Sequence, residues 1–500
     1  MPDVTPPAED VATQATAPAP PERRRVSARR VARNAMLLSA ATVAARLSSF
    51  ALGIALARGL GLSDYGLYGF ALALSLVLQP LADLGMTQYA VREAARDHLR
   101  LEIELSDLFR VKLLATASVL GAASVVAVLV AHNATVAAIV LLMLAAALGD
   151  GVSQLVFGYF QGRERMGFEA RLTTAVALAR ALGGIAAAFA VGSVIAVGAW
   201  ILAVSVVQLT YATARLRRLI VGEARSPRRG RRRPDWRTVL TMGLMVGLTL
   251  GYTRADAVLI GFRLGEEDVG LYAAAYTIML GLQIVPWMMT TALGPVFTST
   301  HARERDAFGR AWQEGIRSVL LVALPLSLTV CLLAGPVIHR AYGAEFAPAA
   351  DSLAVLAWAS PLAALASLAS VALRGAGRER WLVTVSAAAV VVNVGGNLVL
   401  IPTVGIIGAA AMTVVTEVLV TAGLVALGVR HGVLPLPRPP LVRLALAAGA
   451  LAAVALALRN APVELAAGGA LAAFAVAAGV TRLVGASDVA ALRQAARRLG

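Results

Sequence analysis

Residues 60–68 read "LGLSDYGLY", and nearly the same nonapeptide, "LGEEDVGLY", returns at residues 264–272 with six of nine positions identical. Each copy lies between two long apolar runs. A second motif, "GRER", also occurs twice, at 162–165 and at 377–380. The two pairs are separated by 204 and 215 residues, and such similar offsets indicate one structural unit present twice. The fold is therefore expected to contain two similar halves.

The composition indicates a membrane protein. The chain has 500 residues, of which 58% are hydrophobic and only 15% are charged, and its mean hydropathy is +0.75. Soluble domains carry about 25% charged residues. Apolar runs of about 20 residues, the length that one helix needs to cross a bilayer, recur along nearly the whole chain. The sequence therefore predicts an all-α polytopic membrane protein.

Hydropathy predicts about fourteen transmembrane helices. Several of the apolar runs are longer than a bilayer requires, so tilting or kinking is expected, for example at Pro80, Pro286 and Pro325. The predicted spans are 34–57, 66–90, 109–131, 134–160, 168–191, 194–214, 238–262, 269–298, 316–338, 349–372, 381–401, 404–428, 441–458 and 463–484.

The distribution of basic residues supports this count. With the N-terminus inside, 38 of the 45 Lys and Arg residues fall in cytoplasmic segments, Lys112 among them, and three fall within spans. Four remain for the outer loops: Arg58, Arg263, Arg340 and Arg459. Cytoplasmic loops of membrane proteins are enriched in Lys and Arg, and one missed span would invert every later loop. Both termini are therefore expected in the cytoplasm.

The spans divide the chain into six segments. These are a disordered, basic cytoplasmic tail (1–33), an N-terminal six-helix bundle (34–214), a basic cytoplasmic linker (215–237), a C-terminal six-helix bundle (238–428), two appended transmembrane helices (429–484) and a cytoplasmic tail (485–500). An even number of spans in each bundle gives the two copies the same orientation in the membrane. Two parallel bundles that face each other are typical of alternating-access transporters, with the substrate site between them.

Several classes of function are excluded. The net charge of +16 does not indicate nucleic-acid binding, because the arginines lie in short segments between apolar spans rather than on a soluble face. The single cysteine, Cys331, excludes an internal disulfide and a cysteine-based metal cluster. The five histidines are scattered without metal-ligand spacing. No metal, cofactor or catalytic residue is therefore predicted.

Three arginines fall inside predicted spans: Arg46, Arg180 and Arg254. An arginine at the centre of a spanning helix costs roughly 2.5–3.5 kcal/mol on insertion scales, so each must face protein or water. Arg46 and Arg254 occupy equivalent helices of the two copies. Guanidinium groups match phosphate geometry and stay charged when desolvated, so the sequence predicts a cationic cavity for a phosphate-bearing anion. The alternative is that each arginine pairs with a buried carboxylate or caps a backbone carbonyl.

Four acidic residues lie within or at the ends of spans: Asp256, Glu417, Asp83 and Asp150. Any of them could bind a coupling proton or sodium ion. Packing bonds between helices are the favoured role of Asp83 and Asp150, which approach the cytoplasmic ends of their spans, and both roles remain open for Glu417. Arg254 and Asp256 stand two residues apart, so on a continuous helix they would point to nearly opposite sides and each would need another partner.

Two further groups of residues are given structural roles. Asn393 and Asn397 are four residues apart, hence on one helix face, and predict hydrogen bonds between helices. Most tryptophans, Trp287 among them, fall near span ends and are interpreted as anchors at the membrane interface.

Several stretches together resemble a known family. They are "ARGLGLSDYGLYGFALAL" (57–74), "LADLGMTQYAVREAAR" (81–96), "TRADAVLIGFRLGEEDVGLYAAAY" (253–276), "IHRAYGAEFAPAADSLAVLAWA" (338–359) and "VVNVGGNLVLIPTVGIIGAAAMT" (391–413). Over residues 34–430 the chain resembles the polysaccharide transporters of the multidrug/oligosaccharidyl-lipid/polysaccharide (MOP) flippase superfamily. That resemblance implies two six-helix bundles around a central cavity, and flipping of polyprenyl-diphosphate-linked oligosaccharides across the bacterial cytoplasmic membrane. It implies a lipid-linked glycan diphosphate, membrane lipids and polysaccharide-assembly proteins as partners.

Three alternatives are weighed against this function. A lipid II flippase also has fourteen spans and an arginine-lined cavity, and it ranks second. Multidrug cation antiporters need acidic groups in the first helices, where this chain has Arg46. A membrane glycosyltransferase or ligase needs a sizeable polar loop or clustered carboxylates, but the longest outer loop, 338–348, holds Glu345 as its one acid.

Overall fold

The structure is a computed structural model that describes residues 28–130, 134–163, 165–223, 234–251, 254–301 and 305–483. The described chain contains eighteen α-helices and one 3₁₀ helix, so an all-α fold is confirmed. Eleven helical segments, one of them α13 with α14, are long and apolar enough to cross a membrane, or twelve if the bent pair α9–α10 is one span. The predicted number was fourteen. The difference arises at α7 and α8, which are separate short helices, and at α17, which has 17 residues.

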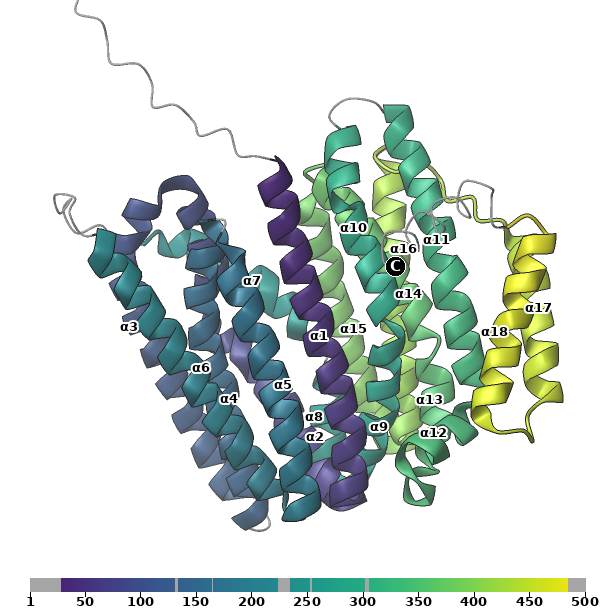
Figure 1. Cartoon of the computed structure of the whole chain (residues 1–500), viewed down its shortest axis with the longest axis horizontal. Coiled ribbons are helices and arrows are strands. Elements are labelled where there is room, and N and C mark those ends of the chain that lie inside the picture. Colours follow the sequence, from purple (N-terminus) through teal and green to yellow (C-terminus); the bar gives the residue numbers. More distant parts are fainter. Residues whose placement is uncertain are drawn as a thin grey trace, which may run out of the picture.

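The helices are roughly parallel, with α2–α6 on one side of α1 and α9–α16 on the other (Figure 1). The first six are α1 (Ala28–Leu60), α2 (Leu62–Asp83), α3 (Met86–Val130), α4 (Ala134–Gly162), α5 (Met166–Ala190) and α6 (Val194–Glu223). The next six are α7 (Trp236–Gly251), α8 (Ala255–Arg263), α9 (Glu266–Leu282), α10 (Ile284–His301), α11 (Arg305–Leu332) and α12 (Ala334–Tyr342). The last are η1 (Ala344–Phe346), α13 (Ala349–Leu356), α14 (Ala359–Gly375), α15 (Glu379–Val404), α16 (Ile406–Arg430), α17 (Leu441–Ala457) and α18 (Val463–Val480).

Most helix contacts are formed between helices of the same part of the chain. In the first part, α1 packs along α5, while α4 contacts α2, α3 and α6. In the second part, α14 contacts α10, α11 and α16, and α15 packs along α16. Helices α17 and α18 pack against each other and against α11, at one edge of the molecule (Figure 1). The "GRER" motifs lie at corresponding junctions, between α4 and α5 and between α14 and α15.

The two copies of the nonapeptide meet where α2 packs against α9. A Cβ atom added to Gly66 would lie 1.9 Å from the carbonyl oxygen of Glu266, and one added to Gly270 would lie 2.6 Å from that of Leu62. These distances are far below van der Waals contact, so side chains larger than hydrogen would separate the helices. Gly66 and Gly270 are the seventh residues of their copies. The repeated motif therefore brings one copy against the other through the same residue.

Further contacts join the two parts of the chain next to this crossing. The Arg58 side chain, at the end of α1, donates its Nε–H to the Ala341 carbonyl oxygen at 2.7 Å. The Leu62 backbone N–H at the start of α2 lies 3.3 Å from Glu345 Oε1. Tyr342 also packs its ring against Tyr65, 6.5 Å between centroids. The predicted outer loop at 338–348 is thus built from the end of α12 and η1, and it ties the two parts of the chain together.

The seventh predicted span, 238–262, differs from the expectation of one continuous helix. α7 ends at Gly251, α8 begins at Ala255, and Arg254 has the non-helical backbone angles φ −141° and ψ 0°. α7 packs against α2 and α3 as well as against α15. α7 therefore contacts both parts of the molecule. Just before α7, and outside the span, Asp235 accepts hydrogen bonds from the side chain and the backbone of Thr238, and these bonds lower its pKa.

Some kinks and segment boundaries also differ from those predicted from the sequence. The axes of α9 and α10 differ by 42°, next to Pro286 as expected, whereas Pro80 and Pro325 lie inside unbroken helices. α1 begins six residues before the predicted start at 34, and α6 continues to Glu223, inside the predicted linker 215–237. Residues 224–233 of that linker, the first 27 residues and residues 484–500 lie outside the described residues, so their predicted roles stay predictions, whereas α7 begins at Trp236, before the predicted end of the linker.

We expect Gly66→Ala to destabilise the protein by about 1–3 kcal/mol, because the added methyl group overpacks the α2–α9 crossing. Thermal unfolding of the purified protein in detergent measures this change. Gly149→Ala is the matched control, since a Cβ at Gly149 would have no heavy atom within 4 Å. Equal unfolding temperatures for the two variants would contradict the close approach at Gly66.

Candidate functional site

A cavity of about 560 Å³ lies between the first six helices and the segment from Arg254 to α10. Its wall includes residues of α1, α2, α4, α5 and α6 on one side and of α8, α9 and α10 on the other. Arg46, Arg180 and Arg254, the three arginines predicted from the sequence, all line it. The fold therefore brings together three side chains, of which the first and the last are more than 200 residues apart in the sequence.

Arg46 and Arg254 are each held against an aromatic ring. The guanidinium carbon of Arg46 lies 4.5 Å from the centroid of the Trp287 ring, and that of Arg254 lies 4.5 Å from the centroid of the Tyr276 ring. A guanidinium over an aromatic face gains a favourable interaction while its N–H groups stay available to a ligand. Among the described residues, neither arginine has a carboxylate within ion-pair distance. These two arginines thus remain as donors toward the cavity.

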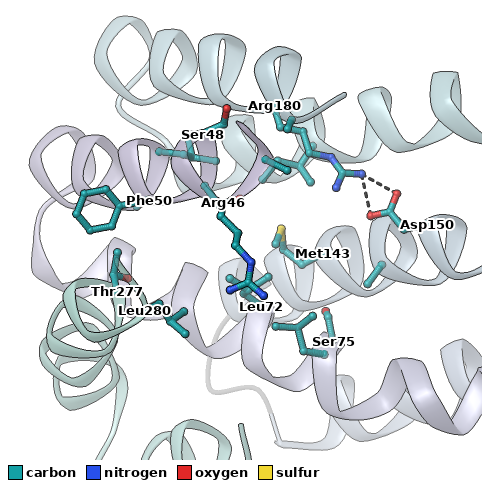
Figure 2. Close-up of a pocket in the computed structure, with 18 of the residues that line it drawn as sticks. Arg46, Ser48, Phe50, Leu72, Ser75, Met143, Asp150, Arg180, Thr277 and Leu280 are labelled. Carbon is teal, nitrogen blue, oxygen red and sulfur yellow. Dashed lines mark hydrogen bonds and ion pairs between the residues drawn. The ribbon is translucent and has the colours of Figure 1, made fainter. Parts of the chain in front are cut away.

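Arg180 is bound by a carboxylate. Its Nη2 donates to Asp150 Oδ1 at 2.6 Å and to Oδ2 at 2.8 Å, and it also lies 2.5 Å from Ser205 Oγ. Figure 2 shows the Arg180–Asp150 pair at one side of the cavity, while Arg46 extends toward Leu72. Both members of the pair are largely buried, at 24% and 20% exposure. For Arg180, the structure has the pairing that the sequence left open as an alternative.

Asp83 also forms an ion pair that joins two helices. Lys112 Nζ lies 2.5 Å from Asp83 Oδ1, and the Thr87 hydroxyl donates to the same oxygen at 2.6 Å. The Lys112 side chain is 1% exposed and lies within the candidate span of α3. Lys112, counted above with the cytoplasmic residues, thus lies in the apolar part of α3, within the predicted span 109–131. The reason for that count is its position in the sequence, two residues after Arg110 at the end of a basic stretch.

Asp256 is fully enclosed and joins three helices. The Tyr272 hydroxyl donates to Asp256 Oδ2, the Thr413 hydroxyl lies 3.3 Å from the same oxygen, and the Ala257 backbone N–H donates to Oδ1 at 2.7 Å. Glu417 follows Thr413 by one helical turn on α16 and has no hydrogen bond among the described residues. Within the same residues, no three His, Cys, Asp or Glu side chains gather as they would around a metal ion. Neither Asp256 nor Glu417 lines the cavity.

The two asparagines of α15 form the expected bonds. Asn393 Nδ2 donates to the Thr416 hydroxyl of α16 at 2.9 Å, and Asn397 Nδ2 donates to Asn393 Oδ1 at 3.1 Å. Both side chains are buried. Asn393 thus joins α15 to α16 as predicted, whereas the bond of Asn397 lies within α15.

Sequence reasoning missed two kinds of residue in this region. Trp287 was assigned to the membrane interface, whereas its ring faces Arg46. Three glutamines, Gln79, Gln154 and Gln208, line the cavity and had no predicted role. The available signal was that a carboxamide inside an apolar span needs a polar partner or water. That signal does not say which cavity a glutamine faces.

Comparison with solved structures identifies the fold. The fold is similar to the lipid II flippase MurJ in an inward closed conformation, with a TM-score of 0.72, 13% identity and coverage of 89% of this chain and 98% of that chain. It is also similar to an inward-facing multidrug resistance MATE family transporter (TM-score 0.60, 17% identity, coverage 78% and 94%). A MOP superfamily transporter from Pyrococcus furiosus gives 0.56, 17%, 81% and 95%. The protein thus has the fold of MOP superfamily transporters.

The family follows from the sequence itself. Residues 31–301 match the family described as polysaccharide biosynthesis protein, and residues 242–399 match the MatE family. The first match spans more than half of the chain, and the chain belongs to the polysaccharide biosynthesis protein family of the MOP superfamily. This is a family of multi-pass membrane transporters and not of enzymes. No curated protein matches the sequence.

We expect Lys112→Met to destabilise the protein by about 3–5 kcal/mol, because it leaves the Asp83 carboxylate without its buried counter-charge. Chemical or thermal unfolding of the purified protein measures the loss. The double variant Asp83→Asn with Lys112→Met removes both charges and should recover most of it. A double variant no more stable than Lys112→Met would show that the ion pair does not join α2 to α3.

Proposed function

We propose that this protein flips a polyprenyl-diphosphate-linked oligosaccharide, a precursor of cell-surface polysaccharide, across the bacterial cytoplasmic membrane. The observation that carries this proposal is the single cavity lined by Arg46, Arg180 and Arg254, in which two guanidinium groups have no carboxylate partner among the described residues. A diphosphate presents several oxygens to planar donors of this kind. Membership of the polysaccharide biosynthesis family supports a glycan as the group attached to it.

The proposed topology has fourteen spans with both termini in the cytoplasm. It counts α7 with α8, α9 with α10, and α13 with α14 as one span each, and it includes α17. Helices α1–α6 and α7–α16 then form the N-terminal and C-terminal bundles, 34–214 and 238–428. The equivalent placement of the two nonapeptides and of the two "GRER" motifs supports this division.

Transport would proceed by alternating access. The outer end is tied shut by the α2–α9 crossing and by Arg58, which suits capture of the diphosphate from the cytoplasmic side. Arg46 and Arg254 bind the diphosphate while the polyprenyl chain stays in the bilayer. The bundles then rock, and the outer contacts separate to release the glycan outside. A membrane potential, negative inside, favours outward movement of the anion by about 2.3 kcal/mol per charge for each 100 mV.

Asp256 and Glu417 are the proposed sites for a coupling proton or sodium ion. Asp256 contacts α9 and α16 through Tyr272 and Thr413, so a change in its charge would act on the packing of three helices. Asp83 and Asp150 are assigned to ion pairs with Lys112 and Arg180 instead.

Flipping of lipid II is the second candidate function. It is favoured by the TM-score of 0.72 with the lipid II flippase MurJ, over 98% of that chain. Both substrates are lipid-linked diphosphates, so the arginine cavity suits either. Competition in proteoliposomes separates them: a lipid-linked oligosaccharide should displace labelled substrate at lower concentration than lipid II, and the reverse order would favour the second function.

We expect Arg46→Ala with Arg254→Ala to weaken binding of a lipid-linked diphosphate at least 100-fold, because each lost charge-assisted hydrogen bond contributes about 1.5–3 kcal/mol. Flipping of a fluorescent lipid-linked sugar in proteoliposomes should fall with it. Replacement of both arginines by lysine should restore only part of the affinity, since an ammonium group lacks the planar fork of donors.

The matched control for this experiment is Arg263→Ala. Arg263 is an exposed arginine at the end of α8 and does not line the cavity. Its loss should leave binding and flipping unchanged. Wild-type rates in the Arg46→Ala, Arg254→Ala double variant would show that the diphosphate does not bind in this cavity.

A further inference from the structure

The polar groups of the cavity are unevenly distributed between its two walls. The wall made by α8, α9 and α10 contributes Arg254, two tyrosines and Thr277, and otherwise apolar or small residues. The wall made by the first six helices adds three carboxamides: Gln79 of α2, Gln154 of α4 and Gln208 of α6. It also carries several hydroxyl groups, Ser75 and Thr173 among them. A ligand that forms many hydrogen bonds would therefore lie against the first six helices.

The carboxamides lie at a defined depth. Arg180 binds Asp150 and Ser205, and this contact fixes the level of α4, α5 and α6 relative to one another. Gln154 follows Asp150 by four residues and Gln208 follows Ser205 by three, so each lies one turn further along the same helix face. In the proposed topology, α4 and α6 both run toward their arginine-rich cytoplasmic ends. The carboxamides thus lie one turn, about 5 Å, to the cytoplasmic side of the Arg180 pair.

Gln154 and Gln208 have no hydrogen-bond partner within the described chain. Gln154 is exposed, whereas every other residue of 151–160 is buried. Because Gln154 lines the cavity, its exposed surface faces the cavity. Gln208 is only 5% exposed, and it also lines the cavity. Buried polar groups in proteins are normally hydrogen-bonded, and an unpaired one costs free energy. A ligand that supplies both donors and acceptors would satisfy them.

We infer that Gln154 and Gln208, with Gln79, form a sugar subsite that binds the glycan next to the diphosphate. Each carboxamide offers a donor and an acceptor, as the hydroxyl and acetamido groups of a sugar require. The arginines bind the diphosphate, the polyprenyl chain leaves toward the bilayer, and the first sugar lies one turn to the cytoplasmic side. This inference rests on the proposed function and adds the residues that distinguish a glycosylated lipid from a bare one.

The test compares two probes on the full-length purified protein: polyprenyl diphosphate carrying a disaccharide, and the same polyprenyl diphosphate without sugar. Wild type should bind the disaccharide lipid about tenfold more tightly than the bare lipid. Gln154→Leu with Gln208→Leu should abolish this preference while leaving the affinity for the bare lipid unchanged. That unchanged affinity also shows that the variant is folded. Gln88→Leu, an exposed glutamine of α3 outside the cavity, is the control and should retain the preference.

The outcomes separate the subsite from the function on which it rests. If the double variant keeps the preference, or if it loses affinity equally for both lipids, the sugar subsite is wrong while diphosphate binding stands. Equal affinity of wild type for the two lipids leads to the same conclusion. If wild type binds neither lipid, the proposed function is wrong, and the subsite with it.

Discussion

A charge inside the apolar layer must find a counter-charge, an aromatic face or water, and this constraint governs the interior of the protein. Two cations meet it by pairing: Lys112 with Asp83 and Arg180 with Asp150. Two others, Arg46 and Arg254, meet it by lying over aromatic rings beside an open cavity. The first solution neutralises the charge and joins neighbouring helices. The second keeps the positive charge and its donors available. Which solution each residue has therefore separates the cations that pair within the fold from those that the proposed function assigns to the diphosphate.

The position of the cavity follows from how the two halves meet. Close packing of α2 on α9 holds them together at the end where Arg58 binds the Ala341 carbonyl, and α7 also contacts both halves. Between these contacts the α1–α6 wall and the α8–α10 wall stay apart, and the three arginines extend into that space. Figure 2 shows how α1 carries Arg46 into its centre. The cavity thus lies between the helices of the two parts, and under the proposed function this is the interface that alternating access would rearrange.

Much of this arrangement could be predicted from the sequence because the membrane imposes strong patterns. Apolar runs marked the helices, the repeated nonapeptide marked the place where α2 meets α9, and buried arginines marked the cavity. Other features depend on contacts that no local pattern records. Lys112 follows a basic cytoplasmic stretch, so its burial could not be read from its neighbours in the chain. The ring of Trp287 could be placed opposite Arg46 only once α1 and α10 were seen together. The non-helical backbone at Arg254 likewise has no proline to announce it.

The meeting of Gly66 with the helix that carries Gly270 has a further meaning. Where a molecule has two-fold symmetry, residues on the axis face their own counterparts in the other subunit. Here the seventh residue of one copy faces the helix of the seventh residue of the other, within a single chain. This is the geometry of an isologous dimer whose subunits have been joined by a peptide linker. The two walls of the cavity depart from this symmetry, because the three glutamines lie on one wall whereas tyrosines lie on both.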